Sequence, residues 1–206
     1  LRRRQRQMCI RDSISYYDWS NGDLKYARRI NGKWIIEVVD EAYDVGMYST
    51  LLLSSNGVPH ICYHDLTHGY LKHAFKQGGK WTIEVIDNSG GVGRDLDAAL
   101  DLEGNLHVSY HDWLRGDLKY ARQTAQGWDI EVVDNLGNVG LYTSIAVDRS
   151  LRPHISYFDS THGDLKYVVG LAGLEPEERP LRVVLIAAAA AVGVLVLVIA
   201  LVRKVF

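Results

Sequence analysis

The sequence predicts an all-β fold, namely a partial β-propeller of four-stranded antiparallel blades with a 47-residue repeat, followed by one C-terminal transmembrane α-helix. Two observations support this prediction: a repeat whose register does not slip between Ile14 and Gly170, and an uninterrupted apolar run near the C-terminus. A constant period without insertions indicates that each copy is one supersecondary unit stacked on its neighbours. The residues that mark the repeat are Tyr16, Tyr63, Tyr110 and Tyr157, Leu24, Leu71, Leu118 and Leu165, and Trp34, Trp81 and Trp128.

The second copy shows how four strands are expected within one blade. Residues 49–54 form an apolar run, an Asn-Gly pair then gives a strong hairpin signal, and residues 59–64 alternate between apolar and polar. Residues 71–76 and 81–87 are the third and fourth strands, joined by a glycine-rich turn. A helical repeat would show a period of about 3.6 residues, so a β-solenoid or a β-sandwich is the main alternative.

Residues 1–13 do not take part in the repeat. Residues 3–13 resemble the translation of a common transposase sequencing adapter, and the repeat begins directly after them at Ile14. No apolar segment follows the arginines, as it would in a signal peptide, so residues 1–13 are interpreted as an adapter artefact. The chain is therefore expected to be a fragment that lacks its upstream blades.

The repeat and the composition divide the chain into segments. A closed ring needs about four to eight blades, and the last copy stops after its third strand, so a strand from the lost N-terminus is expected to complete it. The expected segments are a partial blade at 14–47, whole blades at 48–94 and 95–141, a partial blade at 142–170, a polar linker at 171–182, the transmembrane helix at 183–202 and a short basic tail at 203–206.

The C-terminal apolar run, residues 183–202, contains only Val, Leu, Ile, Ala and Gly. As an α-helix it would span about 30 Å, the thickness of a bilayer core. Basic residues flank both of its ends, so charge does not decide its orientation. We expect a single-pass membrane protein with an extracytoplasmic propeller, and a tail-anchored cytosolic domain is the alternative.

Charge and cysteine content argue against two classes of protein. Residues 14–180 carry 15 basic and 24 acidic side chains, a net charge of −9, which repels phosphate backbones and argues against nucleic-acid binding. Outside the adapter-like segment Cys62 is the single cysteine, so no internal disulfide is expected. No metal or other cofactor is expected, because the repeated histidines lie in different blades and metal ligands must converge.

Residues that recur from copy to copy are interpreted as structural, since each blade needs them regardless of any ligand. An aspartate four residues before a glycine is typical of an Asx turn closed at positive φ. A histidine that opens the second strand is expected to form hydrogen bonds, the tryptophans to pack between blades, and a glutamate on the outermost strand to discourage edge pairing. These residues are Asp18, Asp65, Asp112 and Asp159, Gly22, Gly69, Gly116 and Gly163, His60, His107 and His154, and Glu37, Glu84 and Glu131.

Function is expected on the loops at one face, where the copies differ. Turns after the second strand carry Trp, His and Arg side chains, which are typical of contact with sugars or peptides. In the connections after the fourth strand, an Arg-Asp pair replaces a pattern of Met or Leu followed by Tyr. The alternative is ordinary surface variation and packing between blades. The candidate ligand-binding residues are Trp19, His64, His68, Arg94, Asp95, His111, Trp113, Arg115 and His162.

Three segments, residues 128–134, 153–159 and 163–167, resemble repeats of bacterial and archaeal surface proteins grouped with the sialidase-like propellers. The sialidase Asp-box, Ser-x-Asp-x-Gly-x-x-Trp, is absent. The three arginines, the Tyr/Glu pair and the acidic Asp of a sialidase site cannot be assigned in this sequence either. The resemblance therefore implies the fold and no catalytic residue.

Three functions are compatible with these observations. The favoured one is a membrane-anchored module at the cell surface that binds a glycan or a protein with its loop face. The first alternative is a sialidase-like glycosidase or lyase whose catalytic residues lie partly in missing blades, although the repeated acids are assigned to turns here. The second alternative is a structural repeat domain with no small ligand.

Overall fold

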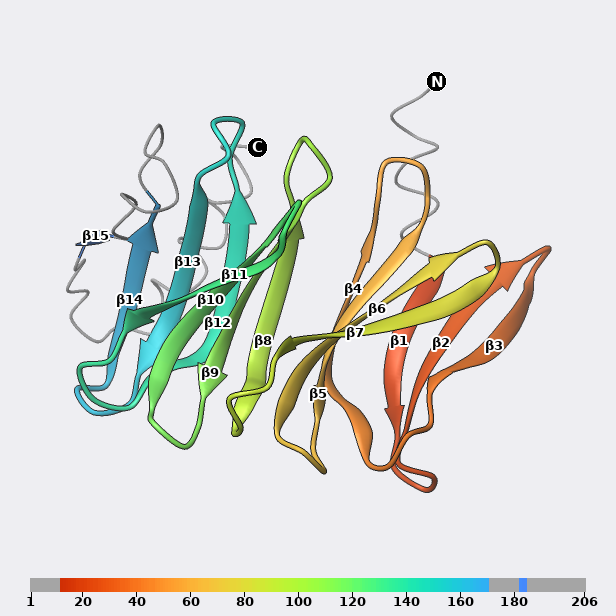
Figure 1. Cartoon of the computed structure of the whole chain (residues 1–206), viewed down its shortest axis with the longest axis horizontal. Coiled ribbons are helices and arrows are strands. Elements are labelled where there is room, and N and C mark those ends of the chain that lie inside the picture. Colours follow the sequence, from red (N-terminus) through yellow and green to blue (C-terminus); the bar gives the residue numbers. More distant parts are fainter. Residues whose placement is uncertain (1–11, 171–181, 185–206) are drawn as a thin grey trace. The chain divides into compact units, whose positions relative to one another are not determined.

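The structure, a computed structural model, describes residues 12–170 and 182–184 (Figure 1). The described residues form antiparallel β-sheet and contain no α-helix, so none of their elements could cross a bilayer as an apolar helix. The adapter-like segment up to residue 11, most of the predicted linker at 171–181, and most of the predicted transmembrane helix and the basic tail at 185–206 lie outside the described residues.

The chain divides into two compact units, residues 1–94 and 95–206. In each sheet, strands that are consecutive in sequence are hydrogen-bonded neighbours, an up-and-down order that fits a propeller-like class. The prediction of an all-β fold with four-stranded antiparallel sheets is therefore confirmed for the residues that the structure describes.

The strand bounds follow the repeat. The first sheet contains β1 (Ser13–Asp18), β2 (Asp23–Ile30) and β3 (Lys33–Asp40), and the second contains β4 (Val45–Leu53), β5 (Pro59–Asp65), β6 (Tyr70–Gln77) and β7 (Lys80–Asp87). The third sheet contains β8 (Val92–Leu100), β9 (Leu106–Asp112), β10 (Asp117–Thr124) and β11 (Gly127–Asp134). The fourth contains β12 (Val139–Val147), β13 (Pro153–Asp159), β14 (Asp164–Val169) and β15 (Arg182–Val184).

The first strand of each four-stranded sheet begins earlier than the sequence predicts. β4 starts at Val45, whereas the expected blade boundary is residue 48. Gly46 and Tyr48 have positive φ values of 106° and 52°, and the pairing of β4 with β5 shifts its register twice at this point. Such an irregularity interrupts the two-residue alternation by which strands are recognised. The same offset recurs because β8 starts at Val92 and β12 at Val139.

The last sheet contains the fourth strand that was expected to come from elsewhere. β15 pairs antiparallel with β14, with Val183 opposite Val168 and Arg182 opposite Val169. Arg182 was assigned to the linker and Val183 and Val184 to the transmembrane helix, so these assignments are corrected. A short valine run suits a strand as well as a helix, because β-branched side chains favour extended backbone and a short apolar run has no diagnostic period.

The core of each unit is built from the residues that mark the repeat. In the first unit, Leu24, Ile61 and Tyr63 are fully buried in one cluster between two sheets. In the second unit, the equivalent positions Leu118, Ile155 and Tyr157 are fully buried too. The same positions recur because each sheet must bury the same apolar face against its neighbour.

Trp81 confirms the expectation that a tryptophan of the fourth strand packs between sheets. Its ring stands edge-on to Tyr26 of β2, with ring centroids 5.3 Å apart. Its indole N–H donates to the carboxylate of Glu37 in β3 at 3.1 Å. Glu37 therefore accepts a hydrogen bond from the next sheet, in addition to any effect that its charge has on edge pairing. Trp34, by contrast, is 48% exposed.

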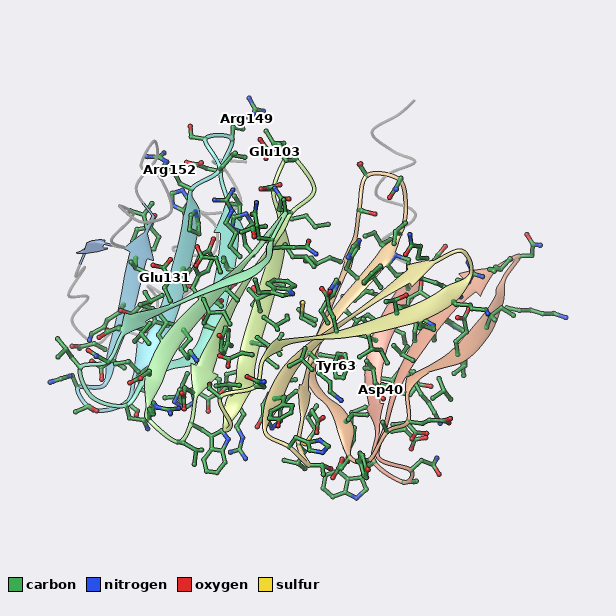
Figure 2. The ribbon with its side chains drawn as sticks, viewed as in Figure 1. Asp40, Tyr63, Glu103, Glu131, Arg149 and Arg152 are labelled. Atoms are coloured by element: carbon green, nitrogen blue, oxygen red, sulfur yellow. The ribbon has the colours of Figure 1, made fainter. Side chains whose placement is uncertain are left out.

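A buried polar cluster joins the two sheets of the first unit. The hydroxyl of Tyr63 donates to the carboxylate of Asp40 at 2.7 Å (Figure 2). The ammonium of Lys72 lies 2.7 Å from Asp65 and 3.5 Å from Asp40. Burial, reinforced by the carboxylate of Asp40, raises the pKa of Tyr63, so its hydroxyl stays a donor at all moderate pH values.

The second unit repeats this cluster at equivalent positions. Tyr157 donates to Asp134 at 2.8 Å, and Lys166 lies 2.7 Å from Asp159 and 3.2 Å from Asp134. Burial opposes the charge on Lys166, but its hydrogen bonds to the two carboxylates outweigh this effect and raise its pKa. The connection between neighbouring sheets is therefore polar as well as apolar in both units.

Candidate functional site

In the first unit, the loops at one end of the sheets are hydrogen-bonded to one another. The backbone N–H of Val45 donates to the carbonyl of Gly22 at 2.9 Å, which joins the start of β4 to the turn after β1. The backbone N–H of Leu66 donates to the carbonyl of Asp44 at 2.9 Å. The turns after the second strand and the connection after the fourth strand therefore form one continuous surface, as the repeat predicts.

The turns themselves are held by the repeated aspartates. The carboxylate of Asp18 accepts the backbone N–H of Ser20 at 3.0 Å, and Gly22 closes the turn with a φ of 74°. Hydrogen bonds from Lys25 and Asn21 lower the pKa of Asp18 to about 2. The predicted Asx turn is confirmed, and the equivalent backbone bonds are His68 to Asp65 at 3.0 Å, Arg115 to Asp112 at 3.1 Å and Thr161 to Asp159 at 2.9 Å.

The histidines that open the second strand also have the expected role. His60 Nδ1 lies 3.0 Å from His73 Nε2, and the two rings are stacked. In the second unit, His107 and His154 each bond a tyrosine hydroxyl of the neighbouring strand and an aspartate of the turn that precedes their own strand. Within residues 12–170, no group of three or more His, Cys, Asp or Glu side chains is placed to hold a metal ion.

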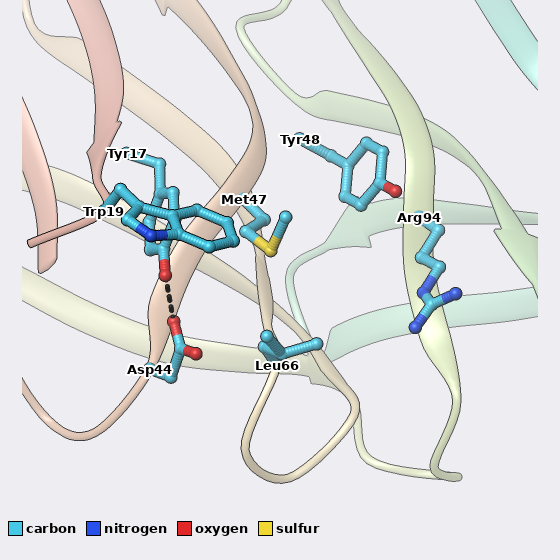
Figure 3. A pocket seen from close by; sticks show the side chains of 7 residues that line it. All are labelled: Tyr17, Trp19, Asp44, Met47, Tyr48, Leu66 and Arg94. Atoms are coloured by element: carbon cyan, nitrogen blue, oxygen red, sulfur yellow. Dashed lines mark hydrogen bonds between the residues drawn. The ribbon is translucent and has the colours of Figure 1, made fainter. Parts of the chain in front are cut away.

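A hollow with a volume of about 410 Å³ opens on the loop surface of the first unit (Figure 3). Trp19 stands over it with 80% of its side chain exposed, and its ring is edge-on to that of Tyr17 at 5.9 Å. Met47 and Leu66 lie between Trp19 and Arg94 in this view. The residues that line the hollow are Tyr17, Trp19, Asp44, Met47, Tyr48, Leu66 and Arg94.

Two polar groups of opposite charge occupy different parts of this hollow. The carboxylate of Asp44 accepts the hydroxyl of Tyr17 at 2.5 Å, and this hydrogen bond raises the pKa of Tyr17 to about 12. The backbone N–H of Asp44 donates to the hydroxyl of Thr67 at 3.1 Å, which fixes the connection. Figure 3 shows the guanidinium of Arg94 beside Tyr48, on the side away from Asp44.

His64, expected among the ligand-binding residues, is fully buried. Its Nδ1 lies 2.8 Å from the carbonyl of Val92, and because a carbonyl only accepts, this nitrogen carries the proton. Burial lowers the pKa of His64, and the positive charge of Arg94 lowers it further. His64 is therefore a neutral imidazole beneath the loops, where it fixes the start of β8 rather than contacting a ligand.

His68 lies on the loop surface, but its side chain stabilises the turn to which it belongs. Its Nδ1 is 2.9 Å from the carboxylate of Asp65, and its ring lies against Tyr70 and Tyr43. Of the four candidates in the first unit, the structure therefore brings Trp19 and Arg94 into one site.

The second unit contains the other five candidates, and most of them have local structural partners. His111 is buried, with Nε2 3.1 Å from the amide oxygen of Asn138. Asp95 is half-buried with a φ of 48°, and Trp113 is 42% exposed. The other two candidates bond turn carboxylates: Arg115 donates to Asp112 at 2.9 Å, and His162 lies 2.8 Å from Asp159.

Five residues that line the hollow were not among the candidates: Tyr17, Asp44, Met47, Tyr48 and Leu66. A usable signal was present in the sequence, because all five lie at positions that differ between copies, either in the loops or near the strand ends beside them. Selecting charged and aromatic loop tips excluded the apolar side chains of Met47 and Leu66.

The described residues form an all-β fold with propeller-like sheets, and the loop surface of the first unit contains a hollow whose lining is both aromatic and charged. Neither the known protein-family models nor the curated proteins give a match to this chain. One solved structure with a similar fold is a protein of unknown function from Dyadobacter fermentans DSM 18053, with a TM-score of 0.52 and 14% identity over 67% of this chain and 42% of that one.

A second similar structure is an ulvan lyase of polysaccharide lyase family PL25, with a TM-score of 0.50 and 15% identity over 71% of this chain and 47% of that one. The same lyase bound to -[GlcA(1-4)Rha3S]- gives a TM-score of 0.50 and 14% identity over the same shares. The chain thus spans less than half the length of these proteins. At such identities the likeness shows the fold alone.

Proposed function

We propose that this chain is part of a β-propeller that binds a glycan in the hollow beneath Trp19. The observation that carries this proposal is the 80% exposure of the Trp19 indole at the rim of a preformed hollow. Apart from its edge-on contact with Tyr17 the indole lies in water, and its flat face matches the apolar face of a pyranose ring. Stacking of this kind is a common way to hold a sugar.

The rest of the lining suits a sugar as well. Met47 and Leu66 supply an apolar wall, whereas Asp44, Tyr48 and Arg94 supply acceptors and donors for hydroxyl groups. The volume of about 410 Å³ lies within the range of about 300–1,000 Å³ that is usual for ligand sites. One of the proteins with a similar fold, the ulvan lyase, has been solved with a bound oligosaccharide, so a related fold can present a glycan-binding surface.

The lining favours binding over glycoside hydrolysis. Hydrolysis uses a pair of carboxyl groups about 5–10 Å apart, and Asp44 is the one carboxylate among the described residues that line the hollow. The pKa of Tyr17 is raised to about 12, so its hydroxyl stays protonated near neutral pH and does not serve as a general base. The lyase or glycosidase alternative would require residues from outside this hollow.

Glycan-array binding by the purified chain tests the proposal. Trp19→Ala should weaken binding about 5- to 150-fold, because stacking contributes about 1–3 kcal/mol in comparable aromatic contacts. Trp34→Ala is the matched control, since Trp34 is a half-exposed tryptophan of the same unit outside the hollow. No binding to any glycan, or equal loss in both variants, would reject the proposal. Cleavage of a bound polysaccharide would instead support the enzyme alternative.

We also propose that the chain is attached to a membrane through its C-terminal apolar run and that the propeller faces the outside of the cell. After β15, residues 185–202 are long enough to extend about 27 Å as an α-helix, close to the thickness of a bilayer core. The chain should partition with liposomes, whereas a chain ending at residue 184 should stay in the aqueous phase. Equal partitioning of the two chains would count against the anchor.

A further inference from the structure

We infer that the second unit contains a further glycan-binding site, built from the residues that correspond to the lining of the hollow in the first unit. This inference rests on the proposed glycan-binding function and adds a second site to it. Three observations lead to it: the recurrence of two aromatic side chains, the hydrogen bonds that hold the loops beside them, and the exposure of both rings to solvent.

Two aromatic residues of the first site recur together two repeats, or 94 residues, further along the chain. Trp19 corresponds to Trp113, and Tyr48 corresponds to Tyr142. One repeat along, the same two positions hold a leucine and an aspartate instead. The sheets therefore form without aromatic side chains at these positions. Because the fold requires neither ring, the return of both rings together points to a shared kind of ligand.

The loops beside these side chains are held by the same hydrogen bonds in both units. The backbone N–H of Asn138 donates to the hydroxyl of Thr161 at 2.7 Å. In the first unit, the backbone N–H of Asp44 donates to the hydroxyl of Thr67 at 3.1 Å. The carbonyl of Asn138 accepts the backbone N–H of Ser160 at 3.0 Å, and the carbonyl of Asp44 accepts the equivalent bond at 2.9 Å. The connection before β12 is therefore fixed to the turn after β13 as the connection before β4 is fixed to the turn after β5.

The aromatic side chains of the second unit are open to solvent. Tyr142 is 75% exposed and Trp113 is 42% exposed. Tyr142 has a φ of 50°, close to the 52° of Tyr48, so the backbone has the same local geometry at the two tyrosines. Leu141, which precedes Tyr142, is half-buried like Met47. The second unit thus offers aromatic faces and an apolar side chain to a pyranose ring, as the hollow does.

The polar part of the second site is an amide instead of a carboxylate. Nε2 of His111 lies 3.1 Å from the amide oxygen of Asn138, at the positions where the hydroxyl of Tyr17 donates to Asp44 at 2.5 Å. An amide is uncharged and both donates and accepts, whereas a carboxylate only accepts. Sugar hydroxyl groups also donate and accept, so the second site suits the same class of ligand.

Equilibrium titration of the purified chain tests the inference. The probe is the shortest oligosaccharide that the chain binds on the glycan array, so that one molecule fills one site. Isothermal titration calorimetry should give two sites per chain. In NMR spectra of the unmodified chain, the indole N–H signals of Trp19 and Trp113 should both shift during the titration, whereas that of Trp34 should stay in place. This second measurement does not depend on the folding of any variant.

Variants assign the two sites. Trp113→Ala should weaken the second site about 5- to 150-fold, as expected for the loss of one aromatic stack, and leave the first site at its original affinity. Trp19→Ala should have the reverse effect, and the double variant should lose both tight sites. Leu102→Ala is the control, since Leu102 is a 76% exposed side chain that precedes β9, whereas Trp113 follows β9. It should retain both sites.

The outcomes distinguish the inference from the proposed function. A single site that Trp19→Ala removes, with no shift of the Trp113 signal, would overturn the inference and leave the proposed function intact. Binding of no glycan would reject both. A single site that responds only to Trp113→Ala would reject the proposed site in the hollow and, with it, the inference of two sites.

Discussion

Tyr63 of β5 donates its phenolic hydrogen to the carboxylate of Asp40 at the end of β3, across the boundary between two sheets. Tyr157 and Asp134 make the same contact in the second unit, at 2.8 Å instead of 2.7 Å. Both tyrosines are fully buried. A buried hydrogen bond to a charged group therefore fixes the contact between neighbouring sheets at the same point of the repeat.

We expect Tyr63→Phe to destabilise the first unit by about 1–3 kcal/mol, because Asp40 would lose a donor in a buried site. Urea unfolding followed by circular dichroism measures this loss. Tyr43→Phe removes a hydroxyl from a side chain that is 70% exposed and should change the midpoint little. Similar midpoints for the two variants would show that the Tyr63 hydroxyl contributes nothing net.

Lys166→Met should cost more, about 3–5 kcal/mol, since it leaves the carboxylates of Asp134 and Asp159 without their shared cation. Burial alone would raise the pKa of Asp159, but hydrogen bonds from Lys166 and His162 outweigh it and hold that pKa below its ordinary value. A lowered pKa stabilises the fold at neutral pH, and this contribution is lost as pH falls below about 4.

Urea midpoints at pH 7 and pH 3 check this second prediction. The unmodified chain should lose more stability between these values than Lys166→Met does, because the variant has already lost the ion pairs. Lys80→Met, an exposed lysine on β7, serves as the control and should follow the unmodified chain. A Lys166→Met variant as stable as this control would contradict the prediction.

His60 also makes stability depend on pH, but for the opposite reason. Its surroundings disfavour the charged form of the side chain, whereas those of Asp159 favour it. Burial, together with the nearby ring of His73, lowers the pKa of His60 from 6.5 to about 4. The folded state therefore prefers the neutral imidazole, and its stabilising effect is complete above pH 6.5 and declines as pH falls towards 4. We expect a loss of about 1–2 kcal/mol over this window after allowance for partial exposure.

His60→Gln should flatten the stability curve between pH 6.5 and 4, because glutamine does not titrate there. Proton NMR of the imidazole signals provides a direct check, since the His60 ring should titrate near pH 4 in the folded chain. A His60 signal that titrates near 6.5 would contradict the expected burial effect.

Gly46 and Gly57 form a matched pair for testing backbone strain. A Cβ at Gly46 would lie 2.8 Å from the Cα of Leu24, whereas a Cβ at Gly57 would meet nothing within 4 Å. Both residues have positive φ, so either alanine costs about 1–2 kcal/mol of conformational strain. We expect Gly46→Ala to lower the thermal midpoint well beyond Gly57→Ala, and equal midpoints would show that the backbone around Leu24 yields.

Much of the fold could be predicted because the same strand and turn signals recur at the same positions of each copy. Strand alternation in one copy, such as residues 59–64, is weak on its own, but four copies in register identify each strand and turn. The start of β4 was not predicted, because Gly46 and Tyr48 break the alternation of apolar and polar residues. β15 was not predicted either, because its valines belong to a longer apolar run that has no strand period.

The site could be predicted only in part, because it depends on which loops touch. Trp19 lies in the turn after β1 and Arg94 near the start of β8, and the sequence does not show that one hollow joins them. His64 and His111 were misplaced although a signal existed. Both lie in the second strand of their sheets, where nearly every side chain is buried, and strand position outweighs residue type there.

The contact between Tyr63 and Asp40 has an evolutionary consequence. The tyrosine recurs in the second strand of every copy, and the first three copies have an aspartate at the end of the outermost strand, so in both observed contacts one copy supplies the donor and the preceding copy the acceptor. A tandem duplication of the gene segment would at once supply both partners of the tyrosine–aspartate contact at the new sheet boundary, without a compensating mutation. Loop tips could then diverge freely, and the number of copies could change while this contact stayed the same.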